Sequence, residues 1–90
     1  DSTKLAKYVG LYEYVLGTRT KLVIANHQLY MEDPEFGTKT QLHWLRDNIF
    51  WIKELDREVV FLTDKKGVVN ALEYSNGMQM IKMSLINELY

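Results

Sequence analysis

Short apolar and aromatic runs recur along the chain, and a cluster of turn-forming residues separates each run from the next. Within most runs apolar and polar positions alternate, which is the period of a half-buried β-strand. Residues 2–7 can form one helical turn before Gly10. The remaining pattern predicts eight strands, at residues 11–16, 21–24, 28–31, 38–45, 49–54, 58–63, 68–74 and 78–84.

The links between the predicted strands are nearly all of hairpin length. Asn26 tolerates the left-handed backbone of a tight turn, and Gly67 and Gly77 stand where hairpin turns favour glycine. Only the loop at residues 32–37, which contains Pro34, is longer. Because closure removes exposed sheet edges, this order of strands predicts an all-β fold, a small closed or nearly closed antiparallel up-and-down barrel of eight strands.

Length and composition limit what the chain can be. Ninety residues predict one domain, spanning residues 1–90, and the absence of cysteine excludes disulfides, thiolate metal sites and a cysteine nucleophile. Eleven basic and twelve acidic residues provide no positive field for nucleic acid. No apolar run approaches the roughly 20 residues that span a bilayer. Since the chain begins at Asp1, we expect a processed product or a piece of a longer protein.

Residues that bind metals are present but are not arranged in a known pattern. The two histidines, His27 and His43, are sixteen positions apart and lack the spacing of a zinc site. Three carboxylates gather in the longest loop without the alternating ligands of a calcium loop, namely Glu32, Asp33 and Glu35. The sequence therefore predicts no metal site.

Signatures of catalysis and of cofactor binding are also missing. None of the three serines lies in Gly-x-Ser-x-Gly or Ser-x-x-Lys, and no glycine-rich segment could hold a phosphate. We therefore expect neither an enzyme nor a bound cofactor. The remaining enzymatic alternative would use Glu13, Asp47 or His43 in an arrangement that their spacing does not reveal.

The aromatic residues leave two interpretations open. Adjacent residues of a strand face opposite sides, so Trp51 points outward if Phe50 points inward. An interior that is not filled would hold a small apolar ligand, lined by Tyr12, Tyr14, Leu22, Phe50, Ile52 and Phe61. An outward apolar stripe would instead meet a partner surface through Trp51, Ile49, Val60 and Leu62, together with Leu11 and Val15.

The order of residues resembles a known family. Residues 5–12 match the Leu-x-x-Tyr-x-Gly-x-Tyr opening of a small lipocalin-like β-barrel domain of unknown function, found C-terminal to beta-lactamase-like and penicillin-binding-protein-like serine hydrolases. Residues 59–72 are similar to its closing pattern of Phe, Asp, Gly, Val and Leu. The hairpin of residues 21–24 and 28–31 also looks like the second and third strands of that domain.

This resemblance implies an accessory role. In such hydrolases the catalytic Ser-x-x-Lys lies in the preceding domain, so the chain would be a noncatalytic domain that packs on or regulates a catalytic domain of the same polypeptide. The resemblance also implies a bacterial protein in the periplasm or outside the cell. The alternative is a lipocalin-like carrier that binds a small apolar ligand in the barrel.

Overall fold

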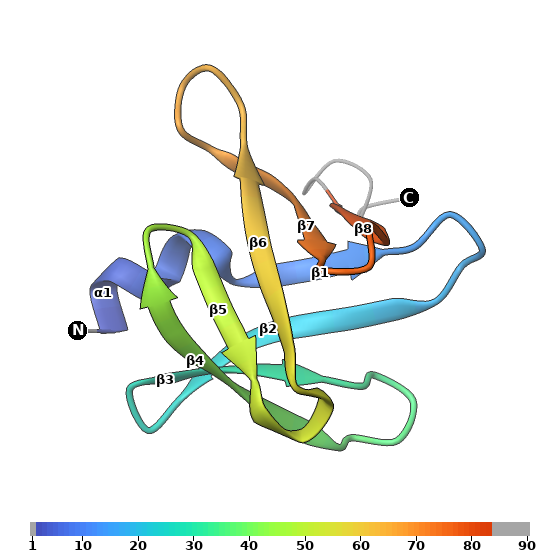
Figure 1. Cartoon of the computed structure of the whole chain (residues 1–90). Helices are drawn as coiled ribbons and strands as arrows, with labels where there is room; N and C mark the ends of the chain where they lie inside the picture. Colours follow the sequence, from blue (N-terminus) through green and yellow to red (C-terminus); the bar gives the residue numbers. More distant parts are fainter. Residues whose placement is uncertain (1, 84–90) are drawn as a thin grey trace.

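A computed structural model describes residues 2–83 of the chain (Figure 1). These residues form a short helical segment followed by eight strands. The elements are α1 (Ser2–Leu5), η1 (Ala6–Tyr8), β1 (Gly10–Glu13), β2 (Arg19–Ala25), β3 (Gln28–Glu32), β4 (Lys39–Arg46), β5 (Ile49–Ile52), η2 (Lys53–Leu55), β6 (Arg57–Thr63), β7 (Val69–Tyr74) and β8 (Gln79–Lys82).

The eight strands form a closed antiparallel barrel in which each strand pairs with its neighbours in the sequence. The circle closes where β1 meets β8, through the pairs Tyr12 with Lys82 and Glu13 with Ile81. Closure leaves the first and last strands with a partner on both sides, so no open edge remains along the sheet. The predicted all-β up-and-down barrel is confirmed, and so is the helical turn before Gly10.

The turn between β2 and β3 follows the predicted chemistry. Asn26 and His27 both have positive φ angles, of 50° and 63°. Two consecutive left-handed residues form the tight connection whose twist matches that of the flanking strands. The left-handed backbone expected at Asn26 is therefore confirmed, and the same geometry places His27 at the tip of the hairpin.

The first strand is shorter than predicted. The strand β1 ends at Glu13, and the next residues form a turn in which the Tyr14 N–H donates to the Thr18 carbonyl at 2.7 Å. Val15 and Leu16 therefore lie in an exposed turn and not on a strand. The prediction that the first strand continues to Leu16 is wrong, because an apolar run can continue beyond the last hydrogen-bonded pair of a strand.

Smaller differences occur at other strand ends. The predicted fifth strand continued to Glu54, but Lys53–Leu55 form the 3₁₀ turn η2, which ends at left-handed Asp56. The strand β2 begins at Arg19, where a turn was expected. In β8 the prediction reached Ser84, which lies outside the described residues.

The core consists of the inward-facing side chains of all eight strands. Phe50 and Ile52 are buried and alternate with Ile49 and Trp51, which are partly exposed on the outer face. The same alternation in the other strands fills the interior. The buried apolar residues are Tyr8, Tyr12, Leu22, Leu29, Leu42, Phe50, Ile52, Val59, Phe61, Val69, Ala71, Leu72 and Met80.

Tyr8, from the helical segment, closes one end of the barrel. Its ring packs on Phe50 and Phe61, with centroid distances of 5.1 and 4.5 Å. The Tyr8 hydroxyl donates to Asn48 Oδ1 at 2.7 Å, and the Tyr12 hydroxyl donates to the Tyr8 carbonyl at 2.8 Å. The segment is thus attached to the β4–β5 turn and to β1 by bonds that a purely apolar plug would lack.

Removing the Tyr8 hydroxyl tests this attachment. Tyr8→Phe keeps the ring packing but leaves Asn48 Oδ1 without its donor, so we expect a loss of about 0.5–1.5 kcal/mol in the free energy of unfolding. Tyr8→Ala removes the ring as well and should cost about 3–5 kcal/mol. Urea denaturation measures both, with Tyr30→Phe on the outer part of β3 as the matched control. Equal losses in Tyr8→Phe and Tyr30→Phe would contradict the role of the bond.

The buried tyrosines also predict how stability depends on pH. Burial, with a smaller contribution from Tyr8, raises the pKa of Tyr12 well above its usual range, and burial raises the pKa of Tyr74. The unfolded chain therefore loses these protons first, near pH 10, so it is favoured as the pH rises further. Burial lowers the pKa of Lys82, so the folded chain loses this proton first and the free energy of unfolding rises with pH between the lowered pKa and the ordinary one. This opposite contribution therefore belongs to a lower pH range than that of the tyrosines.

We expect the free energy of unfolding to fall above about pH 10 by up to about 1.4 kcal/mol per pH unit for Tyr12 alone. Urea denaturation from about pH 9 to pH 11.5 measures this slope. Tyr12→Phe should lower stability at neutral pH and flatten the alkaline slope, because the substituted ring has no proton to lose. An alkaline slope as steep in Tyr12→Phe as in the original protein would show that another group is responsible.

Candidate functional site

The six residues predicted to line an internal ligand pocket lie in or against the packed core. Five of them are at most 1% exposed, and Tyr14 packs against the cluster from a turn. Their rings interlock, since Phe61 lies 5.5 Å from Phe50 and 6.0 Å from Tyr12 between ring centroids. The remaining members of the predicted set, Leu22 and Ile52, are fully buried.

A pocket of about 480 Å³ opens instead at the end of the barrel that carries the helical segment. Figure 1 shows α1 beside this end, next to the turn between β4 and β5. We call this cavity the mouth pocket. It is lined by Lys4, Leu5, Lys7, Tyr8, His27, Gln28, Leu29, Leu42, Trp44, Asp47 and Phe50. Only Phe50 belongs to the predicted ligand-binding set.

The mouth pocket has an apolar floor and a polar rim. Leu29, Leu42 and Phe50 are each 1% exposed and form the floor together with Tyr8. The rim carries Lys4 and Lys7 from the helical segment, His27 and Gln28 from the β2–β3 hairpin, and Asp47 from the β4–β5 turn. A concave apolar surface with a few polar groups at its edge is the usual form of a small-molecule site.

Trp44 forms one side of the mouth pocket because it lies two residues after buried Leu42 and pairs with buried Phe50, which puts it on the inward face near the end of β4. The register of β4 against β5 shifts between Trp44 and Arg46, so one extra residue, Leu45, is accommodated by a bulge. Trp44 is 64% exposed, and its indole N–H donates to the Asp47 carbonyl at 3.0 Å. This bond holds a large aromatic surface beside the pocket without burying it.

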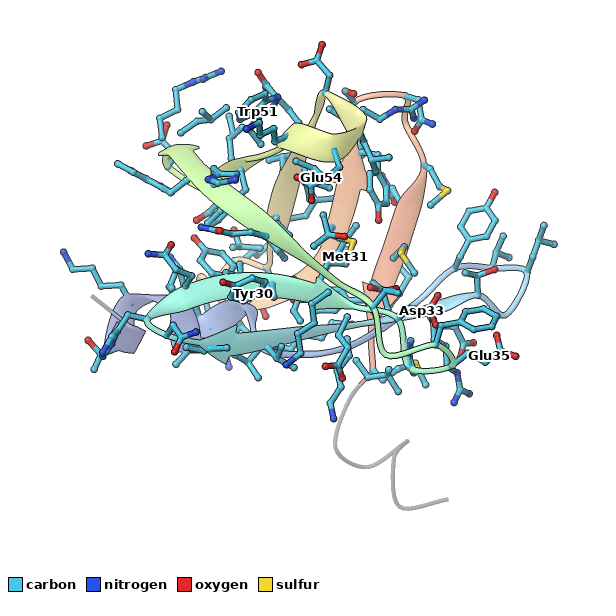
Figure 2. The ribbon with its side chains drawn as sticks, turned by 90° about the horizontal axis from the view of Figure 1, so that it is seen from below. Tyr30, Met31, Asp33, Glu35, Trp51 and Glu54 are labelled. Atoms are coloured by element: carbon cyan, nitrogen blue, oxygen red, sulfur yellow. The ribbon has the colours of Figure 1, made fainter. Side chains whose placement is uncertain are left out.

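The predicted outer stripe is partly covered. Trp51, Ile49, Val60 and Leu62 all face outward but are only partly exposed. The Trp51 indole N–H donates to Asp56 Oδ1 at 3.1 Å, and its ring lies 5.9 Å from that of His43. Figure 2 shows Trp51 on the outside of the ribbon, well away from Asp33 and Glu35 in this view. Of the two further predicted members, Leu11 is partly exposed on β1 and Val15 lies in the turn after it.

The most exposed large apolar side chains lie elsewhere, on two loops at the barrel end opposite the helical segment. Val15 and Leu16 in the β1–β2 turn are 86% and 83% exposed, and Phe36 in the β3–β4 loop is 77% exposed. The two loops are neighbours, since residues 16–19 and 33–35 line a common depression. Figure 2 shows Asp33 and Glu35 in the second of these loops, near the β1–β2 turn. We call Val15, Leu16 and Phe36 the loop-tip patch.

The loop-tip patch stands on ordered loops. Asp33 Oδ1 accepts the backbone N–H of Glu35 at 2.8 Å and that of Phe36 at 3.1 Å. Asp33 also donates its own N–H to the Thr38 carbonyl. The side chain of Asp33 thus organises the backbone that presents Phe36.

Groups with catalytic or metal-binding chemistry are dispersed. Within residues 2–83 no three histidine, aspartate or glutamate side chains come close enough to hold a metal ion. Glu13 forms an ion pair with Arg19 at 2.8 Å, Asp47 lies at the mouth pocket and His43 lies beside Trp51. These three residues, the remaining enzymatic alternative, therefore occupy separate places.

The sequence contained partial signals for the residues that its interpretation missed. Lys4 and Lys7 are three positions apart, which places them on neighbouring parts of one helical turn. Tyr8 precedes the first strand and belongs to no alternating run. Only its apolar ring and its position in the Leu-x-x-Tyr-x-Gly-x-Tyr pattern of residues 5–12 could have indicated that it matters to the fold. The positions of His27 and Trp44 at the same pocket depend on tertiary structure.

No protein-family model matches this chain, and a comparison with curated proteins finds no match. Within the described residues no helix is long and apolar enough to cross a membrane. Because barrels of this kind support many unrelated activities, a function has to be argued from the surface and pocket residues themselves.

Proposed function

We propose that this chain is a noncatalytic interaction domain that packs on, and regulates, a serine hydrolase catalytic domain of the same polypeptide. The observation that supports this proposal best is the loop-tip patch, where three large apolar side chains are each more than three-quarters exposed on adjacent loops. Apolar side chains gathered in this way are typical of a surface that meets another protein. The identity of the partner rests on the resemblance to hydrolase-associated barrels.

The packing of the barrel interior favours this role over that of a carrier. The side chains that would surround an enclosed apolar ligand contact one another, and five of the six are at most 1% exposed. Admitting a ligand among them would require the loss of ring contacts at 5.5 and 6.0 Å. The outer surface, in contrast, can meet a partner without any change in the core.

Binding to the separately expressed catalytic domain tests the proposal. The gene that encodes this chain should encode an upstream domain with Ser-x-x-Lys, and the two domains should associate when mixed. Leu16→Ser combined with Phe36→Ser should weaken association at least about tenfold, since buried side chains of this size contribute about 1.5–3 kcal/mol each. Isothermal titration calorimetry measures the affinity.

The matched control combines Val68→Ser with Leu55→Ser, which removes two exposed apolar side chains outside the β1–β2 turn and the β3–β4 loop. Both double variants should unfold within about 0.5 kcal/mol of the original protein, because they change exposed positions. A Trp51→Ala variant distinguishes the outer stripe from the loop-tip patch as the contact surface. An upstream sequence without a hydrolase domain, or equal binding by both double variants, would contradict the proposal.

A further inference from the structure

We infer that the mouth pocket binds a small organic anion, a carboxylate attached to an apolar body. This inference is independent of the proposed role of the loop-tip patch, which lies at the opposite end of the barrel. It follows from the shape, the charge and the aromatic side of the pocket, and from residues other than those predicted to enclose a ligand.

The floor of the mouth pocket fits an apolar body. Leu29, Leu42 and Phe50 belong to the core but reach the cavity, so a ligand there would contact the same apolar surface that holds the barrel together. The volume of about 480 Å³ falls within the usual range for small-molecule sites. The exposed indole of Trp44, held by its bond to the Asp47 carbonyl, provides a flat surface against which an aromatic ring can pack.

The charged residues on the rim of the mouth pocket determine which sign of charge the ligand should carry. Lys4 and Lys7 share the rim with a single carboxylate, that of Asp47, and the His27 ring adds an N–H group that can donate a hydrogen bond to an anion. Neither lysine forms an ion pair with any residue in the part of the chain that the structure describes. The chain as a whole carries a formal charge of −1, so the basic rim is a local property.

Lys7 is the better placed of the two lysines. Its Nζ lies 5.2 Å from the centroid of the Tyr8 ring, which keeps the charge near the edge of the apolar floor. Its backbone carbonyl accepts a hydrogen bond from Lys82 Nζ at 3.2 Å, which ties this turn of the helical segment to β8. The ammonium group is therefore held by a short and anchored segment next to the cavity.

Three probes with the same apolar body and different charges test the inference. Phenylbutyrate, phenylbutyramide and phenylbutylammonium are titrated into the Trp51→Phe variant, in which Trp44 is the only fluorophore of its kind. We expect phenylbutyrate to bind more tightly than the amide, and the ammonium compound to bind most weakly. Raising the salt concentration should lower the affinity for phenylbutyrate to near that for the amide, and it should leave the affinity for the amide unchanged.

Single lysine variants locate the charge that selects the anion. Lys7→Gln should reduce the affinity for phenylbutyrate roughly two- to fivefold and leave the affinity for the amide unchanged. The matched control, Lys53→Gln, removes an exposed lysine in η2, at the opposite end of the barrel, and should change neither. Amide chemical shifts recorded by NMR should change at Gln28, Leu29 and Leu42.

Several results would overturn the inference. Equal affinity for the acid and the amide would show that the basic rim does not select the ligand. Equal effects of Lys7→Gln and Lys53→Gln would place the selecting charge elsewhere. Absence of any response from Trp44, or shift changes confined to residues outside the mouth pocket, would show that the pocket is not the binding site.

Discussion

The docking of Tyr8 into the end of the barrel is the interaction on which the rest of the molecule depends. Its ring completes an aromatic cluster with Phe50 and Phe61, and its two hydrogen bonds join the helical segment to β1 and to the β4–β5 turn. A barrel of this size has few buried side chains, so each large ring supplies a considerable part of the stability. Every buried side-chain nitrogen or oxygen among the described residues has a hydrogen-bond partner, so this polar attachment adds no unpaired group to the core.

The two ends of the barrel differ because only one of them has this plug. The end with the helical segment holds a cavity whose floor is core and whose rim is basic. The other end is closed by side chains of its own strands, where the Tyr74 hydroxyl donates to Met31 Sδ at 3.2 Å, and its loops carry the loop-tip patch. Two surfaces of different chemistry are thus separated by a packed interior. A partner protein at one end and a small molecule at the other could bind at the same time.

The number, type and order of the strands could be predicted from the sequence because they follow from local alternation and turn residues. Phe50 and Ile52 were placed inward by alternation alone, and Asn26 was recognised from its tolerance of a left-handed backbone. Details that depend on the competition between neighbouring segments could not be predicted. Leu16, for example, continues the apolar run of β1, but it lies inside the turn that the hydrogen bond from the Tyr14 N–H to the Thr18 carbonyl closes.

The candidate sites were less predictable than the fold. Alternation places Trp44 on the same face as Leu42, but its exposure at the mouth pocket depends on the β4–β5 turn, where the Asp47 carbonyl accepts the indole N–H. The mouth pocket itself combines the helical segment with β3, β4 and β5, so no single stretch of sequence contains it. The outer stripe was assigned from alternation, which identifies an outward side chain but not how far its neighbours cover it.

The closure of the circle between β1 and β8 has a consequence for the order of folding. All other strand pairs join neighbours in the sequence and need only a hairpin loop, whereas this pair and the bond from Lys82 to Lys7 bring together segments from opposite ends of the described chain. The entropy lost in closing so long a loop is offset only when most of the sheet is in place. The meander should therefore form first and the seam last, and the mouth pocket, which needs the helical segment in position, is completed in the same late step.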